Sequence, residues 1–326
     1  MTDRKVTLSE VAKLAGVSLG AASKVLNGGT SKIGVGAEAR KRILEAARKL
    51  NYQPNMAASI LAGGSSKMIG VFVDSFAHYR TMRLLQEIER LASAQGYRIV
   101  TSFTHDNIAN MREDYQALQR YGVNSFICCA HDYPDLKNEV AELFQGSKNV
   151  VFMESPCIPG MPYVRTSRLK ALTAMIGDAY KQGYRKIGLL HGHHTDLSER
   201  TLHEMFLEAM AANGLEPDDK LIFEYAKSPA DPQLRVHAAL EKMIRPYRPD
   251  FLFVDDAASA VSLRNELFNA GLNLTIYGGD NDALFRYMGM KSFDPCYEKA
   301  AEELLKLLFH PESRSEIPVI EAVYKK

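Results

Sequence analysis

Residues 7–27 read TLSEVAKLAGVSLGAASKVLN, and this stretch decides the fold of the first part of the chain. Thr7 and Glu10 have the spacing of a capping box, in which a hydroxyl and a carboxylate satisfy the first amides of a helix. Apolar residues then recur at helical spacing until Gly16, which can take the positive φ that ends a helix. Ser18 is the N-cap of a second helix that stops near Asn27. Two short helices joined by a short glycine-containing turn predict a helix-turn-helix.

A third helix is expected from about Glu38 to Leu50, with Ile43, Ala47 and Leu50 facing the first two. Residues 1–66 carry ten Lys and Arg against four Asp and Glu, although the whole chain has a net charge of only +1. Residues 67–326 carry the remaining thirty Lys and Arg against thirty-five Asp and Glu. A basic segment joined to a mildly acidic remainder favours a polyanionic partner for that segment. A solvated basic surface explains the charge equally well, so charge alone does not decide the function.

The same region resembles the DNA-binding head of the lactose-repressor/galactose-repressor (LacI/GalR) family. The residues that carry the resemblance are Thr7, Leu8, Val11, Ala12, Ala15, Gly16, Val17, Ser18, Ser23, Val25, Leu26, Asn27, Arg40, Ile43, Ala46, Asn51, Tyr52, Pro54 and Asn55. The resemblance implies a cytoplasmic homodimer that binds a pseudo-palindromic operator in double-stranded DNA. The alternative is a helical hairpin that serves only for packing.

In a helix-turn-helix the second helix lays its N-terminal turn in the major groove, where side chains reach base edges. The predicted DNA-binding residues are Thr7, Ser18, Leu19, Gly20, Ser23, Lys24, Asn27, Asn55, Ala58 and Leu61. Two of them depart from the family pattern: Gly20 has no side chain to read a base, and Lys24 stands where arginine is common. Leu19 has the chemistry to touch a thymine methyl. The operator sequence therefore does not transfer from relatives.

Residues 54–66 match the hinge helix of the family. Small Ala57 and Ala58 allow two such helices to approach closely in a dimer, and Leu61 falls where the family inserts a leucine wedge into the minor groove. A helix this short is marginal by itself in water, so it is expected to fold only on DNA. The alternative is a flexible linker, and both interpretations agree in the absence of DNA.

From residue 67 onward, short β-rich runs alternate with amphipathic helices, which predicts doubly wound parallel sheets. A weak internal repeat, QGYRI at 95–99 and QGYRKI at 182–187, indicates two similar lobes. The expected architecture is an all-α helix-turn-helix head (1–53), a hinge (54–66) and a periplasmic-binding-protein-like α/β core (67–326). Lobe 1 is expected at about 67–163 plus 293–312, and lobe 2 at about 164–292 plus 313–326, with the strand at 317–323 in lobe 2.

Ligands of such sheets bind beyond the carboxyl ends of the strands. The predicted effector-binding residues, for a small molecule that the resemblance makes carbohydrate-like, are Ser75, Phe76, Tyr79, Arg200, Asp256 and Asp280. Asp280 matches a carboxylate that binds effector hydroxyls in many relatives. Two positions depart from the family: Ser167 replaces an aspartate, and Leu202 replaces a ligand-binding arginine. The lining of the cleft is therefore non-standard.

The sequence gives no sign of an enzyme, a cofactor or a metal centre. No phosphate-binding glycine-rich loop or Ser-His-Asp set is evident in the sequence. His191-Gly192-His193-His194 is interpreted as a loop at the cleft rim, because neighbouring histidines at a strand end point apart. The four cysteines lack metal-type spacing and are expected to be buried thiols in a reducing compartment. No apolar run is long enough for a membrane span, and the start of the chain lacks the apolar core of a signal peptide.

Three functions remain in view. The first is a ligand-gated, operator-specific dimeric repressor. The second is a DNA-binding regulator whose effector site is degenerate, which Ser167 and Leu202 favour. The third is a transport-type solute-binding protein with an unrelated head, which the missing signal peptide and the hinge motif disfavour.

Overall fold

The fold was analysed in a computed structural model that describes residues 6–27, 34–53, 65–73, 79–104, 107–130, 136–192, 201–225, 232–279 and 281–324, apart from the side chains of Asn27, Tyr79, Lys137 and Pro232. The chain divides into a small N-terminal unit and a larger α/β unit. We call residues 6–53 the head and residues 69–324 the core.

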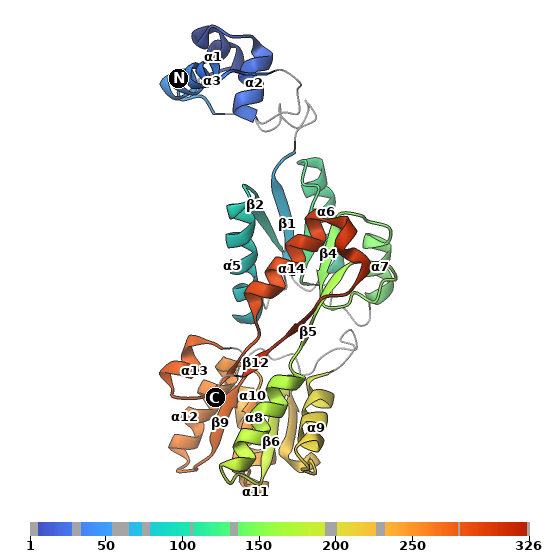
Figure 1. The fold of residues 1–326 in the computed structure, drawn as a ribbon. Coiled ribbons are helices and arrows are strands. Elements are labelled where there is room, and N and C mark those ends of the chain that lie inside the picture. Colours follow the sequence, from blue (N-terminus) through green and yellow to red (C-terminus); the bar gives the residue numbers. More distant parts are fainter. Residues whose placement is uncertain are drawn as a thin grey trace. The chain divides into compact units, whose positions relative to one another are not determined.

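The head contains α1 (Leu8–Ala15), α2 (Leu19–Asn27) and α3 (Ala37–Lys49) (Figure 1). The predicted capping box is confirmed: the Thr7 hydroxyl accepts from the Glu10 amide, and the Glu10 carboxylate accepts from the Thr7 amide at 2.8 Å. Gly16 ends α1 with a φ of 64°, the left-handed conformation that favours glycine. Ser18 then accepts from the Ala21 amide at 3.2 Å and begins α2.

One apolar face of each helix closes the core of the head. The fully or nearly buried residues are Val11, Ala12, Ala15, Ala22, Ile43, Ala46 and Ala47. Leu50, which was expected on the inner face of α3, lies just after the helix and packs at the edge of this cluster. Most of these side chains are small, so the three helices approach closely and need few buried residues.

The first lobe of the core is a six-stranded sheet with the order β11-β5-β4-β3-β1-β2. Its elements are β1 (Met68–Val73), α5 (Tyr79–Ala94), β2 (Arg98–Phe103), α6 (Ile108–Arg120), β3 (Phe126–Cys128), α7 (Lys137–Phe144), β4 (Val150–Met153), β5 (Tyr163–Ser167), α14 (Tyr297–Phe309) and β11 (Val319–Glu321).

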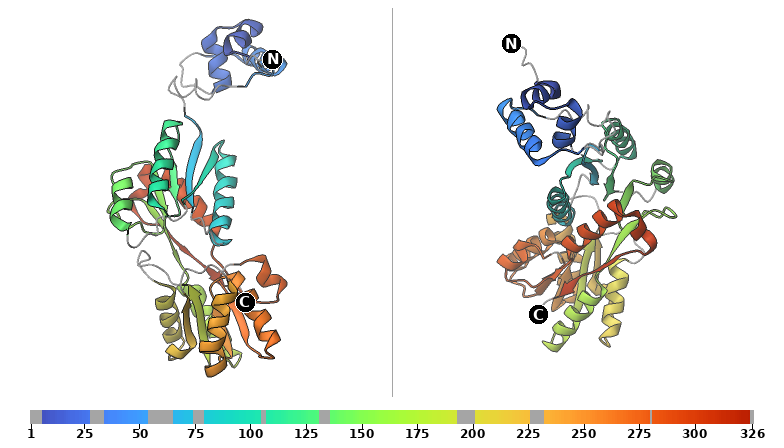
Figure 2. Two further views of the ribbon diagram at one scale, coloured as in Figure 1. Left: turned by 180° about the vertical axis from the view of Figure 1, so that it is seen from behind. Right: turned by 45° about the horizontal axis from the view of Figure 1, so that its top comes forward.

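Alternate residues of each strand face opposite helical layers, as a period of two requires. In β1, Val71 and Val73 belong to the apolar cluster shared with α5 and α14. Phe72 points the other way and meets Tyr115 of α6 and Phe144 of α7, with ring centroids 6.3 Å apart in both pairs. Figures 1 and 2 show helices on both sides of this sheet. The prediction of a doubly wound lobe is confirmed.

The second lobe is a four-stranded parallel sheet with the order β7-β6-β8-β9. Its elements are α8 (Leu169–Lys181), β6 (Ile187–Gly192), α9 (Leu202–Ala212), β7 (Ile222–Tyr225), α10 (Pro232–Ala239) with a following π-turn (Leu240–Ile244), α11 (Arg245–Tyr247), β8 (Phe251–Val254), α12 (Ala257–Asn269), β9 (Thr275–Gly278) and α13 (Ala283–Tyr287). Leu189 and Phe253 face α8 and α9, whereas Leu190 and Val254 face α10 and α12.

The chain passes between the lobes three times, after β5, before α14 and after β11. Two short strands accompany these passages, because β10 (Phe293–Asp294) pairs antiparallel with β12 (Val323–Tyr324). Phe293 and Ala322 are buried in the core of the second lobe.

These pairings correct the expected lobe boundaries. Residues 164–167, expected at the start of lobe 2, belong with residue 163 to β5 in the sheet of lobe 1, since β5 pairs with β4. The strand expected in lobe 2 at 317–323 is β11, which pairs with β5 in lobe 1. Residues 293–294, expected in lobe 1, pair with β12 instead. Strand propensity locates such segments, but the neighbour of a strand is decided by long-range pairing that the local sequence does not encode.

The expectation that all four cysteines are buried is confirmed in full for Cys128 and is wrong for Cys157. Cys128 is buried and Cys129 and Cys296 are half-buried, whereas Cys157 is exposed. Burial raises the pKa of the Cys128 thiol to about 12. No helix among the described residues is both long and apolar enough to cross a membrane.

Candidate functional site

Helix α2 presents two faces of different character. Ala22, Val25 and Leu26 pack into the core of the head. Gly20, Ser23 and Lys24 follow the spacing i, i+3 and i+4, so they lie on the opposite side of the helix, and the side chain of Asn27 lies outside the described residues. The packing that holds the head together therefore turns this polar stripe away from the core.

The start of α2 adds further groups. The side chain of Leu19 is 53% exposed, an unusual exposure for a leucine, and Ser18 is also exposed. Amides in the first turn of a helix have no partner within the helix and can bind anions such as phosphate. Thr7 is exposed too, but its hydroxyl already belongs to the α1 capping box.

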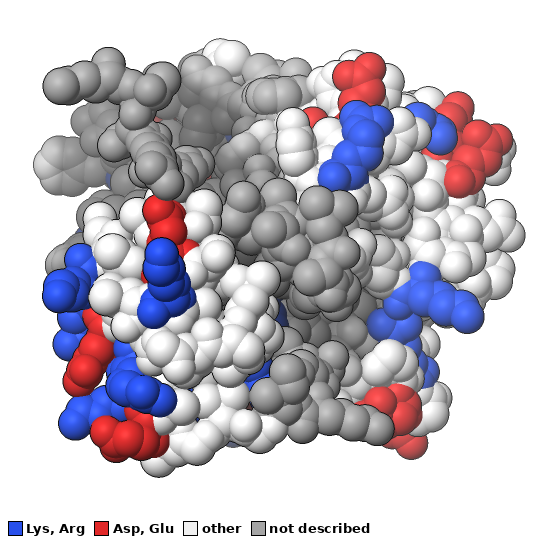
Figure 3. Space-filling model, turned by 90° about the horizontal axis from the view of Figure 1, so that it is seen from above, with Lys and Arg blue, Asp and Glu red and all other residues white. Residues whose placement is uncertain are grey.

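Helix α3 supplies most of the exposed positive charge of the head. Its exposed basic residues are Arg40, Lys41, Arg42, Arg48 and Lys49. On the face drawn in Figure 3, Lys and Arg side chains lie beside Asp and Glu side chains rather than in one uninterrupted patch. This face therefore shows basic and acidic side chains interspersed, without a broad positive patch among the described residues. Asn55, Ala58 and Leu61 of the expected hinge lie outside the described residues.

A second polar site lies between the lobes of the core, around Asp255. This residue follows β8 and its side chain is 1% exposed. Arg80 of α5 in the first lobe binds it with both terminal nitrogens, at 3.1 Å to Oδ1 and 3.0 Å to Oδ2. Arg168, in the passage between β5 and α8, donates from Nη1 to Oδ1 at 2.7 Å. One buried carboxylate thus joins both lobes to the segment that connects them.

Asp256, the next residue, has different partners. Its Oδ1 accepts from the Ser259 amide at 2.8 Å as the N-cap of α12, and its Oδ2 accepts from the Tyr225 hydroxyl at 2.6 Å. Burial, reinforced by the neighbouring carboxylates, raises the pKa of Tyr225 far above its usual range. The Tyr225 hydroxyl therefore stays protonated and remains a donor. Above it, the Arg235 guanidinium lies 4.6 Å from the centre of the Tyr225 ring.

Of the predicted effector residues, the structure places Asp256 at the carboxyl edge of the second-lobe sheet. Ser75, Phe76, Arg200 and Asp280 lie outside the described residues, as does the side chain of Tyr79. The Leu202 departure has a structural explanation, because Leu202 begins α9 and is buried with Met205 and Phe206 in the core of the lobe.

Sequence reasoning missed the role of Arg80 and Arg168. Arg168 stood out only as the neighbour of the unusual Ser167, and Arg80 carried no signal, since it lies on a helix distant in sequence from Asp255. A signal did exist for Asp255, because a carboxylate directly after a fully apolar strand is costly to bury without a partner.

The sequence and the fold of this chain are similar to those of known proteins. The model of the family "Bacterial regulatory proteins, lacI family" matches residues 7–55. The sucrose operon repressor of Klebsiella pneumoniae is 28% identical over 66% of this chain, and the match spans 64% of that protein, less than two thirds of its length. The transcriptional repressor PurR of Mannheimia succiniciproducens is 22% identical over 93% of this chain and 91% of its own.

Among solved structures, the lac repressor dimer bound to operator and the anti-inducer ONPF matches with a TM-score of 0.78. The match covers 99% of this chain and 98% of that one at 21% sequence identity. At this identity the likeness establishes the fold alone, a helical head followed by a core of two parallel-sheet lobes.

The Asp255 cluster leads to a prediction about stability. Asp255→Asn is expected to destabilise the core by about 3 kcal/mol, because it leaves two guanidinium groups without their buried counter-charge. Arg168→Gln should cost less, since Arg80 still pairs with the carboxylate. Unfolding by urea measures both. The matched control is Glu298→Gln, which breaks the exposed pair with Arg90 and should barely move the midpoint. Equal midpoints for Asp255→Asn and Glu298→Gln would contradict this role.

Proposed function

Because the chain belongs to the lacI family of bacterial regulatory proteins, we propose that it is a sequence-specific DNA-binding transcriptional repressor. The observation that carries the proposal is the polar stripe of α2, held opposite the core of a head that matches the family over residues 7–55. Its work is binding and not catalysis.

The head would read DNA with the first two turns of α2. Lys24 donates to a base edge in the major groove as a point charge, without the fork geometry of arginine. Gly20 lets the backbone approach the groove closely, and exposed Leu19 contacts a thymine methyl. Ser18, Ser23 and the α2 amides bind phosphates and fix the register, aided by the exposed basic residues of α3.

We further propose that two copies act together on a pseudo-palindromic operator. A structure that this chain matches is of a lac repressor dimer. The core offers a face with the character of an interface: α12 and α13 expose Phe268 (84%), Tyr287 (85%) and Leu284 (45%) beside a groove lined by Val261 and Met288. Apolar side chains gathered in one exposed patch are a feature of protein–protein interaction sites, whereas singly exposed ones are normal on a monomer. In each half of such a dimer, Asn55, Ala58 and Leu61 of the hinge would contact the minor groove at the operator centre.

The effector we propose is a hydroxyl-rich, carbohydrate-like small molecule bound between the lobes. The proposal is supported by the name of the sucrose operon repressor and by the parallel strands that end at this edge. Ser75, Phe76, Tyr79, Arg200, Asp256 and Asp280 are the proposed lining. A carboxylate such as Asp280 can accept two hydrogen bonds from neighbouring hydroxyls.

A second candidate is a regulator that works without an effector. It is favoured by the state of the two described carboxylates, because Asp255 and Asp256 already have protein donors on both oxygens. A ligand that used either of them would have to share the carboxylate with these donors or displace one of them. The burial of Leu202 points the same way, since the position no longer offers a donor to the cleft.

The prediction for DNA binding concerns Lys24. With an operator obtained by selection from random oligonucleotides, Lys24→Ala is expected to weaken specific binding by about 1–3 kcal/mol and to relax preference at one position of each half-site. Lys299→Ala, an exposed lysine of the core, serves as the control and should leave affinity unchanged. Affinity should also fall steeply with salt, because bound phosphates release counterions. An equal loss on operator and on random DNA would mean that Lys24 only contacts phosphate.

The prediction for the effector uses a thermal-shift screen of sugars. A true effector at 100 times its Kd should stabilise the protein by about 2.7 kcal/mol. Asp280→Asn should weaken that effector by roughly ten- to a hundredfold, since it replaces a charged acceptor with a neutral one. The exposed Asp219→Asn is the matched control. If no compound stabilises a protein that still binds its operator, the second candidate replaces the first.

The prediction for the dimer is a change of mass. Phe268→Glu should convert dimers to monomers in sedimentation experiments, because it places a charge within an apolar interface. Tyr121→Glu changes another strongly exposed aromatic residue, 75% exposed, and should leave the dimer intact. A Phe268→Glu protein that sediments as a dimer would remove α12 and α13 from the interface.

A further inference from the structure

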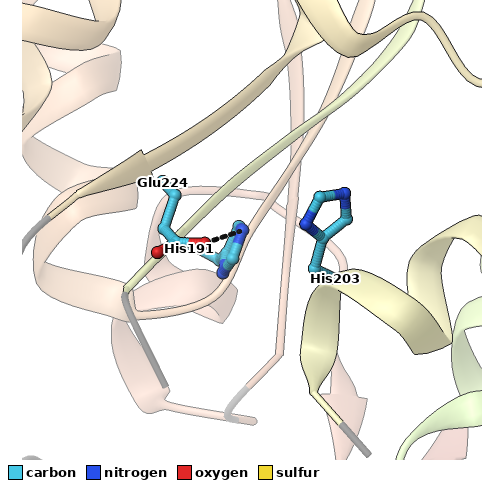
Figure 4. A group of neighbouring side chains, drawn as sticks. All are labelled: His191, His203 and Glu224. Carbon is cyan, nitrogen blue, oxygen red and sulfur yellow. Dashed lines mark ion pairs between the residues drawn. The ribbon is translucent and has the colours of Figure 1, made fainter. Parts of the chain in front are cut away.

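Three potential metal ligands lie together at the carboxyl edge of the second-lobe sheet. They are His191 at the end of β6, Glu224 near the end of β7 and His203 in the first turn of α9 (Figure 4). One ligand atom from each, a ring nitrogen or a carboxylate oxygen, lies within 4.8 Å of the other two. The sequence did not predict this group, because its members are distant in sequence and only the run at 191–194 suggested a metal.

The fold brings the three residues together by two separate devices. His191 and Glu224 are direct neighbours in the parallel register of β6 and β7, so their side chains project from the same face of the sheet. His203 is held by the start of α9, where Thr201 and Glu204 form a capping box with bonds of 2.7 and 3.1 Å. The rings of His191 and His203 are 5.7 Å apart between centroids.

The hydrogen bond of His191 fixes which nitrogen faces the group. Its Nδ1 lies 2.9 Å from the Gly192 carbonyl oxygen, and a carbonyl can only accept, so Nδ1 carries the proton. This leaves Nε2 directed at Glu224 Oε2, 3.7 Å away. An Nδ1–H bond to a backbone carbonyl is the usual support of a histidine that binds metal through Nε2.

The Glu224 carboxylate beside His191 also favours a bound cation in this group. A neutral His191 would place its Nε2 lone pair opposite a carboxylate, and the side chain is only 2% exposed. His203 turns one ring nitrogen toward His191 and Glu224 (Figure 4). Either a proton on His191 or a metal ion can neutralise the Glu224 carboxylate. A metal ion shared by the three side chains also gives the Nε2 lone pair of His191 and the facing nitrogen of His203 a common partner.

We propose that His191, His203 and Glu224 bind one divalent transition-metal ion of the zinc class. Two imidazole nitrogens and one carboxylate oxygen are a ligand set that suits Zn²⁺, Co²⁺ or Ni²⁺ rather than Mg²⁺ or Ca²⁺. Glu224 is 41% exposed, so its side chain can close onto the ion. Three protein ligands leave at least one position for water or for an oxygen of a small molecule.

The experiment uses Co²⁺ as the probe, with the full chain stripped of metal by a chelator. Binding of one Co²⁺ per chain should produce the visible absorption bands of a low-coordinate site. His203→Ala and His191→Ala should each lower Co²⁺ affinity by at least ~100-fold. Loss of a residue that only orients a metal ligand lowers affinity by less than this. Glu224→Gln, at a partly exposed position, should weaken binding without a risk to folding. His237→Ala removes an exposed histidine of the same lobe and should change nothing.

The outcomes distinguish a bound metal ion from a proton on His191 as the positive charge beside Glu224. Co²⁺ affinity that is equal in His203→Ala and His237→Ala, with circular dichroism showing both folded, would overturn the proposal. A wild-type chain whose Co²⁺ spectrum matches that of the ion in water would also overturn the proposal, because such a spectrum shows no bound ion. The positive charge beside Glu224 would then be a protonated His191. The experiment includes neither DNA nor a sugar, so its result is independent of the proposed function.

Discussion

The parallel pairing of β6, β7 and β8 is the constraint on which the chemistry of the core depends. Parallel strands end at a common edge, so the residues at their carboxyl ends collect there whatever their separation in sequence. This edge receives His191, Glu224 and the Asp255-Asp256 pair. Charged groups gathered at a largely buried edge must find compensating partners, and the surrounding segments supply them.

Asp255 shows how that compensation acts over a distance. Its counter-charges come from α5 of the first lobe and from the passage after β5, so the same bonds that neutralise a buried carboxylate also join the lobes. A change in the angle between the lobes must break or rearrange these bonds. A ligand can shift such an equilibrium only by its difference in affinity between the two arrangements. The Asp255 cluster therefore contributes to the free energy of any rearrangement of the two lobes.

In the head, the local sequence signals and the tertiary packing specify the same structure. Capping groups at Thr7 and Ser18 begin α1 and α2, and Gly16 ends α1. The small residues between them pack on Ile43 of α3. Packing one side of α2 exposes the other, so the residues that build the head also orient those proposed to read DNA.

The sequence by itself determined the features that depend on residues close together in the chain. The helix-turn-helix, the alternation of strands and helices and the family resemblance all follow from short-range periodicity, capping and turn residues. It also placed Asp256 beyond the carboxyl end of a strand. Only the tertiary structure decided that β5 and β11 belong to the first lobe, that Arg80 and Arg168 share Asp255, and that His203 lies beside His191 and Glu224. These contacts join residues far apart in the chain, and their partners are chosen by the packing of whole elements, which no local pattern of residues records.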